Sequence, residues 1–98
     1  MATDTLATRH YWVQGRVQGV GFRHFVWREA LERGIEGWVR NLRDGSVEVF
    51  VRAPDEVLDD FELTLGRGPR WGRVDALRRE DEGPGRSGGA GFEIRSTA

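Results

Sequence analysis

Three glycines and two arginines lie close together in the segment Gly15 to Arg23, which has the sequence G-R-V-Q-G-V-G-F-R. Glycine lets a backbone turn tightly and approach a ligand closely. Successive N–H groups in such a turn can point into one concavity and bind an anion. Arg23 lies at the start of a predicted helix, where its guanidinium can donate to two phosphate oxygens and the helix N-terminus adds positive charge. The segment therefore predicts an oxyanion-binding loop.

Other interpretations of this segment stay open on the residues alone. An ordinary turn between a strand and a helix often carries glycines. A nucleotide P-loop is excluded, because Lys-Ser or Lys-Thr does not follow the last glycine, and the spacing G-x-x-x-G-x-G does not fit a dinucleotide fingerprint. Taken singly, Arg23 can be a solvated helix charge, and Asn41 can be a strand-end residue that bonds its own backbone.

The elements that must position these residues follow from apolar periodicity. Val47, Val49 and Val51 alternate with Glu48, Phe50 and Arg52, which indicates a strand with one well-buried face. Asp44-Gly45 before them indicates a hairpin turn. The spacing of apolar residues predicts a helix from Phe22, which Gly34 ends. A second helix is expected to start near Pro54. The predicted strands cover residues 10–13, 36–42, 46–52, 71–80 and 92–95, the last one short.

The predicted order is β-α-β-β-α-β with a short extra strand, which implies a ferredoxin-like α+β sandwich. We expect an antiparallel sheet with both helices on one face, in a single domain over residues 1–98. Residues 1–7 are expected to form a disordered tail. Residues 81–91 contain five glycines and one proline and are expected to form a flexible loop. This fold hosts many activities and identifies none.

Composition limits the classes of function. The chain is 38% hydrophobic, and 15 basic residues against 16 acidic ones give a net charge of −1. Nucleic-acid and anionic-membrane binders usually carry a basic excess, so we expect neither partner. Cysteine is absent, which excludes a thiol nucleophile and fits a cytoplasmic protein. His10 and His24 are isolated, so no metal site is expected.

Three blocks of sequence together resemble the acylphosphatase family. They are G-R-V-Q-G-V-G-F-R at 15–23, G-W-V-R-N at 37–41 and D-G-S-V-E-V at 44–49. The resemblance covers roughly residues 9–79, with a looser match at residues 92–95, and the first block is its most specific part. The glycine-rich segment 81–91 looks longer than a family hairpin needs, and residues 96–98 extend past the final strand.

The resemblance implies a hydrolase of carboxyl-phosphate anhydrides, such as acetyl, carbamoyl or glyceroyl phosphate, which works without a metal or cofactor by in-line attack of water. It implies that Arg23 and Asn41 are catalytic: Arg23 binds the substrate phosphate and Asn41 positions the water. The implied phosphate-binding loop consists of Gly15, Arg16, Val17, Gln18, Gly19, Val20, Gly21 and Phe22. We expect a monomer. The acyl group of the substrate and any role of Arg43 stay open.

Three rival functions occur on this fold. RNA-recognition modules share the sandwich, but they carry an R/K-G-F/Y strand motif that this sequence lacks. A non-catalytic interaction domain is a second alternative, against which the presence of both Arg23 and Asn41 argues. The third is a domain of a large carbamoyltransferase that matures hydrogenases. We favour a stand-alone enzyme over it.

Overall fold

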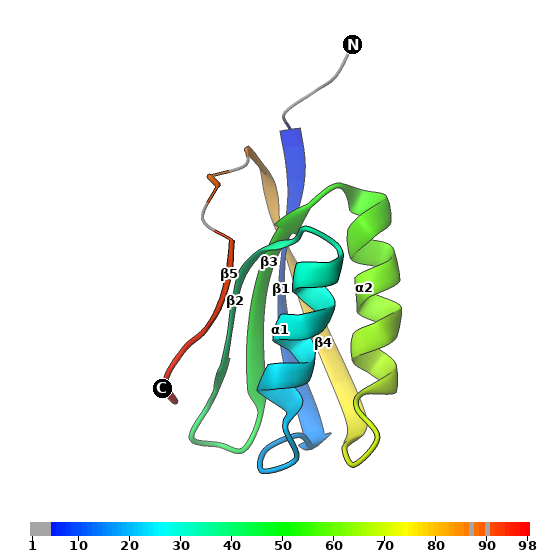
Figure 1. Cartoon of the computed structure of the whole chain (residues 1–98), viewed down its shortest axis with the longest axis vertical. Coiled ribbons are helices and arrows are strands. Elements are labelled where there is room, and N and C mark those ends of the chain that lie inside the picture. The colour runs from blue at the N-terminus through cyan, green and yellow to red at the C-terminus, as the bar shows by residue number, and fades with distance from the viewer. Residues whose placement is uncertain (1–4, 87, 90) are drawn as a thin grey trace.

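A twisted five-stranded sheet carries both helices on one of its faces (Figure 1). The computed structural model describes residues 5–86, 88–89 and 91–98. The strands are β1 (Thr5–Arg16), β2 (Glu36–Asn41), β3 (Val47–Ala53), β4 (Arg73–Arg86) and β5 (Phe92–Ile94), and their order across the sheet is β4-β1-β3-β2-β5. The helices are α1 (Phe22–Glu32) and α2 (Asp55–Arg67). The predicted ferredoxin-like order of elements is confirmed.

Successive side chains of the central strands point to opposite faces of the sheet, so every second residue packs against the helices. Val47, Val49 and Val51 are fully buried, and so are Tyr11 and Val13 on the neighbouring β1. Helix α1 contributes the apolar face that its spacing predicts, and α2 contributes a similar face. The buried residues of the two helices are Phe22, Phe25, Val26 and Ala30 in α1, and Leu58, Phe61, Thr64 and Leu65 in α2.

The fifth strand corrects the expectation of a purely antiparallel sheet. The pairs β1–β3, β1–β4 and β2–β3 are antiparallel, but β5 pairs with β2 in parallel. The reason is topological: β4 ends at the end of the sheet where β2 begins, so the returning chain runs in the direction of β2 (Figure 1). The Arg95 N–H then donates to the Val39 carbonyl (2.8 Å), and the Ala98 N–H donates to the Asn41 carbonyl (3.0 Å).

Two expectations about loose segments are wrong where the structure describes them. Strand β1 already begins at Thr5, and β4 continues to Arg86, through half of the segment expected to be a flexible loop. The two segments pair with each other, Leu6 opposite Gly85 and Ala7 opposite Pro84. Pro84 is tolerated because β4 is an edge strand. The rest of the expected tail, residues 1–4, and residues 87 and 90 of the expected loop lie outside the described residues.

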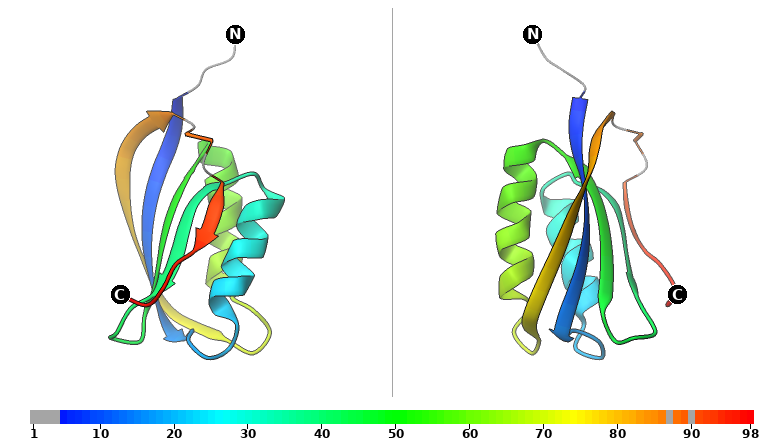
Figure 2. Two further views of the ribbon diagram at one scale, coloured as in Figure 1. Left: turned by 60° about the vertical axis from the view of Figure 1, so that its left-hand side comes forward. Right: turned by 180° about the vertical axis from the view of Figure 1, so that it is seen from behind.

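Figure 2 shows that the helices leave one face of the sheet uncovered. This face carries an aromatic cluster. Its rings belong to His10, Trp12, Trp38 and Phe50, with neighbouring centroids 4.0–5.9 Å apart. Arg78 covers Trp12 at 3.8 Å. Three arginines on this face also pair with carboxylates, in the ion pairs Arg40–Glu48, Arg78–Glu80 and Arg95–Glu93. These cations are therefore already engaged within the chain.

Within the part of the chain that the structure describes, neither helix has the length and the apolar composition that a membrane span requires.

Candidate active site

Three connections meet at one end of the molecule, the lower end in Figure 1. They are the loop between β1 and α1, the hairpin turn between β2 and β3, and the connection between α2 and β4. The predicted anion-binding loop is the first of these, and Asn41 is the last residue of β2 before the hairpin turn. The antiparallel pairing of β1 with β3, and of β3 with β2, brings the loop and Asn41 to the same edge of the sheet.

The loop between β1 and α1 leaves the start of α1 open to a ligand. Gly19 and Gly21 have φ angles of 74° and 77°, in the left-handed region that only glycine adopts easily. Gly21 is the N-cap of α1 and supplies no side-chain cap, and the first turn of α1 contains no acidic residue. Helix α2 instead has Asp55 and Glu56 in its first turn. The positive end of α1 is therefore left for an external anion.

A pocket of about 230 Å³ opens at this helix end. Its wall is built from the loop, the first turn of α1, the end of β2 and β5, with the residues Val17, Gly19, Gly21, Phe22, Arg23, His24, Asn41 and Ile94. Arg23 is half-buried, and its guanidinium Nη1 donates to the carbonyl oxygen of Arg95 at 3.1 Å. Both predicted catalytic residues thus line the same cavity.

Asn41 brings an unsatisfied amide to this pocket. Its side-chain Oδ1 is buried and has no hydrogen-bond partner among the described residues. Its backbone is held on both sides, because Asn41 pairs with Val47 on β3 and its carbonyl accepts from the Ala98 N–H. A rigidly held amide with an unused acceptor is suited to bind a small polar molecule such as water.

The hairpin turn beside Asn41 is closed by its own hydrogen bonds. The carboxylate of Asp44 accepts from the Ser46 N–H at 2.9 Å and from the Ser46 hydroxyl. These bonds lower the pKa of Asp44 below its ordinary value, because the donors favour the charged carboxylate. From the loop between β1 and α1, the side-chain amide of Gln18 donates to the carbonyl oxygens of Leu42 (2.8 Å) and Ser46 (2.9 Å).

The predicted loop divides into a part that lines the pocket and a part that does not. Gly15 and Arg16 lie in β1, opposite Val74 and Arg73 of β4. At Gly15 the two strands approach so closely that a Cβ would lie 2.2 Å from the Arg73 carbonyl oxygen. Gln18 and Val20 belong to the loop but not to the pocket wall.

Sequence reasoning did not place His24, Ile94 or the Arg95 carbonyl at the site. His24 follows Arg23 in the first turn of α1, is exposed, and packs its ring against Trp27 at 5.3 Å. Ile94 arrives through the parallel pairing of β5 with β2. No local pattern in the sequence signals that pairing. Among the described residues, no group of three or more His, Asp or Glu side chains could hold a metal ion.

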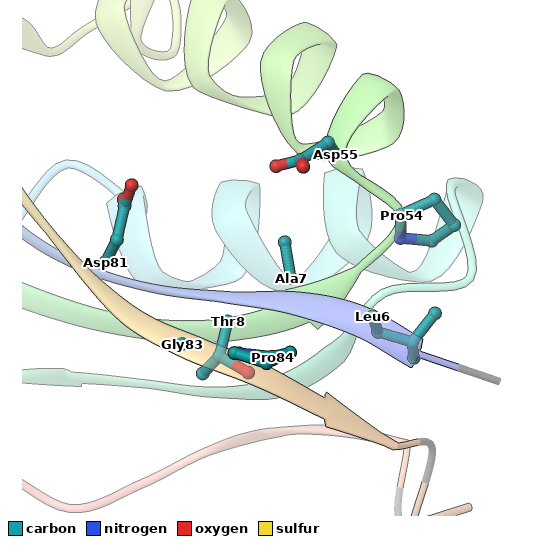
Figure 3. A pocket seen from close by; sticks show the side chains of 8 residues that line it. All are labelled: Leu6, Ala7, Thr8, Pro54, Asp55, Asp81, Gly83 and Pro84. Carbon is teal, nitrogen blue, oxygen red and sulfur yellow. The ribbon is translucent and has the colours of Figure 1, made fainter.

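A larger cavity, of about 390 Å³, lies beside the starts of β1 and α2 (Figure 3), at the upper end of the molecule in Figure 1. Two carboxylates line it, Asp55 from α2 and Asp81 from β4, and they pair with Arg9 and Arg79 respectively. Its lining residues include no lysine or arginine, so it does not suit an anionic substrate.

Comparison with known proteins decides between the classes of function. The acylphosphatase family model matches residues 9–94. The chain belongs to the acylphosphatase family. It is 51% identical to the acylphosphatase of Koribacter versatilis over 84% of this chain and 74% of that one, and 42% identical to that of Moorella thermoacetica over 95% and 98%. Its activity is that of an acylphosphatase, a hydrolase.

The same family accounts for the fold. The crystal structure of acylphosphatase from Bacillus subtilis matches with a TM-score of 0.85 at 35% identity, over 91% of this chain and 98% of that chain. These acylphosphatases are thus covered over most of their own length, so this chain resembles small proteins of the family.

Proposed function

We propose that the pocket at the start of α1 binds the phosphate of an acyl phosphate, and that water attacks the phosphorus directly. Backbone N–H groups between Arg16 and Phe22 hold the non-bridging oxygens, and Arg23 adds a permanent positive charge. Asn41 holds the attacking water through its side-chain amide. The observation that carries the proposal is that Arg23 and Asn41 line one cavity at an uncapped helix N-terminus.

The chemistry asks little more of the protein than position and charge. Phosphoryl transfer depends mainly on aligning the nucleophile and on stabilising the charge of the transition state. As the water oxygen bonds to phosphorus, the bond from phosphorus to the acyl oxygen breaks and a carboxylate leaves. The carboxylate is a good leaving group, so no strong general acid is needed. The proton of the water passes to an oxygen of the transferred phosphate.

Arg23 would contact two partners at once in this cycle. Its guanidinium now donates one bond to the Arg95 carbonyl. A guanidinium has five N–H donors, so it can keep this bond and still present others to a phosphate. The Arg95 carbonyl would then orient the Arg23 guanidinium toward the pocket and would not compete with the substrate.

The proposal needs one chain and no cofactor. All of the proposed site residues come from this chain, so a monomer suffices, and the residues supply every polar group that the reaction uses. A cytoplasmic setting stays part of the proposal, on the absence of cysteine alone.

The test is phosphate release from benzoyl phosphate or acetyl phosphate with EDTA present, beside a simple phosphate monoester. The expected result is hydrolysis of the anhydride only, at the same rate with and without EDTA. Strict dependence on an added metal, or preference for the monoester, would overturn the proposed mechanism.

A further inference from the structure

Gln18 is the polar link between the phosphate-binding loop and the strand that carries Asn41. Its Nε2 donates to the carbonyl oxygens of Leu42 and Ser46, at 2.8 and 2.9 Å. Leu42 directly follows Asn41, and Ser46 directly precedes the start of β3. Both N–H donors of one half-buried amide are therefore used on the two ends of a single hairpin turn.

The hairpin turn does not need these bonds to close. The Leu42 N–H already donates to the Ser46 carbonyl at 2.9 Å, and the Gly45 N–H donates to the Leu42 carbonyl at 3.1 Å. Asp44 adds its own bonds to Ser46. Each carbonyl that Gln18 contacts therefore keeps a backbone donor when Gln18 is removed, and no buried acceptor is orphaned.

The loop depends on the Gln18 hydrogen bonds more than the hairpin turn does. Among the described residues, no backbone–backbone hydrogen bond outside the strands and helices involves residues 17–20. Packing of Val17 in the core fixes the start of the loop, and α1 fixes its end. Between these points, the Gln18 side chain attaches the loop to the hairpin. The loop amides stay available to a ligand because this attachment uses a side chain.

We infer that Gln18 is a positioning residue. It holds the phosphate-binding loop at the correct distance from the water bound by Asn41. This inference rests on the proposed function. In-line attack requires the phosphorus and the water oxygen to be aligned within a fraction of an ångström, and a displacement of 1 Å can cost about 10²-fold in rate. The Gln18 bonds set the distance between the elements that hold these two reactants.

The test is a double-mutant cycle of Gln18→Met and Asn41→Ala. Met has a similar length but donates no hydrogen bond. We expect Gln18→Met alone to lower kcat for benzoyl phosphate by about 10- to 100-fold, with a much smaller change in the inhibition constant of inorganic phosphate. The backbone N–H groups of the loop and Arg23 still bind phosphate in this variant, whereas the phosphate is no longer aligned with the water on Asn41. In the Asn41→Ala background, Gln18→Met should cause almost no further loss.

The matched control is Gln14→Met, because Gln14 is the other glutamine in the sequence and lies exposed on β1. It should keep parental kcat. Thermal unfolding should place every variant within about 8 °C of the parent. If Gln18→Met does not fold, Gln18→Asn replaces it, since this side chain keeps the amide but is too short to reach both carbonyls.

The outcomes separate this inference from the proposed function. Parental kcat in Gln18→Met, losses that multiply in the double variant, or equal losses in kcat and phosphate binding would each overturn the inference and leave the proposed function intact. Absence of acyl phosphate hydrolysis in the parent, or full activity of Asn41→Ala, would overturn both.

Discussion

The guanidinium of Arg23 and the carbonyl oxygen of Arg95 lie 3.1 Å apart in a hydrogen bond, although 72 positions separate them in the sequence. The segment that contains Arg95 also runs along β2, where the Arg95 N–H donates to Val39 and the Ala98 N–H donates to Asn41. One stretch of main chain therefore contacts both proposed catalytic residues. The site is held from the side of β5 as well as by its own loop.

Arg23→Ala should lower kcat for acyl phosphate hydrolysis by about 10²–10³-fold, because it removes the permanent charge at the phosphate. The variant should fold, since Arg23 is only half-buried and its side chain makes one hydrogen bond within the described part of the chain. Phosphate-release kinetics and circular dichroism check both points. The matched control is Arg28→Ala, an exposed arginine on the same helix, which should keep parental kcat.

Asn41→Ala should separate activity from stability. We expect kcat to fall by about 10²–10³-fold, because the attacking water loses its hydrogen bond to the Asn41 side-chain amide. The free energy of unfolding should stay equal or rise, because the buried Oδ1 has no partner among the described residues and such an atom costs about 1–3 kcal/mol. Urea unfolding measures the second quantity. A loss of more than about 1 kcal/mol would show that the amide has a structural role instead.

Arg95→Pro should impair the enzyme although Arg95→Ala does not. Proline removes the N–H that donates to Val39, and with it the attachment of the segment that orients Arg23. We expect kcat/KM to fall by about tenfold or more in the proline variant. Alanine keeps the N–H and the carbonyl and removes only the side chain over Trp38, so its kcat/KM should match the parent. Equal kinetics of the two variants would contradict the role of the main chain.

Gly15→Ala and Gly66→Ala should change stability in opposite directions. Gly15 has a φ of +134°, and a Cβ there would meet the Arg73 carbonyl oxygen, so β1 and β4 must separate locally. We expect a loss of about 1–3 kcal/mol or more. Gly66 lies in α2 with open space around it, so alanine should add about 0.5–1 kcal/mol. Thermal unfolding of the two variants is the measurement.

Asp44 should contribute a pH-dependent part of the stability. Bonds from the Ser46 hydroxyl and N–H lower the pKa of Asp44 in the folded protein. A lowered carboxyl pKa stabilises the fold above the ordinary pKa of about 4, and the contribution is lost as the pH falls toward the folded value. Asp44→Asn keeps an acceptor for the Ser46 N–H but does not titrate there.

The parent should therefore lose more stability than Asp44→Asn between about pH 5 and about pH 3, by urea unfolding. Asp75 and Asp81 also have lowered pKa values, through hydrogen bonds from Arg73 and Arg79. Both aspartates are present in the parent and in Asp44→Asn. The difference between the two plots of stability against pH therefore reports on Asp44. Parallel curves would show that the Asp44 bonds are absent in solution.

Local patterns were enough to predict the central elements. Alternation at Val47, Val49 and Val51 places β3, and the apolar spacing after Phe22 starts α1 at the correct residue. Asp44-Gly45 marks the hairpin because its turn is closed by bonds within a few residues. Each of these features depends on neighbours in the sequence.

The features that were missed depend on partners far away in the sequence. The glycines and Pro84 near the end of β4 do not favour a strand, yet pairing with residues 5–8 of β1 makes one. The parallel position of β5 follows from where β4 ends. The bonds of Gln18 join residues 24 and 28 positions apart, and nothing about a glutamine in a glycine-rich loop indicates which carbonyls it will find.

The parallel pairing of β5 with β2 also has a consequence for synthesis on the ribosome. The chain emerges from its N-terminus, so the loop, α1 and Asn41 leave the exit tunnel well before Arg95 does. Domains generally fold as units during translation, and contacts between distant residues form late. The bonds of the Arg95–Ala98 segment to Val39, Asn41 and Arg23 can therefore close only once translation has passed them. A nascent chain stalled before β5 would carry both proposed catalytic side chains without the main-chain segment that contacts them.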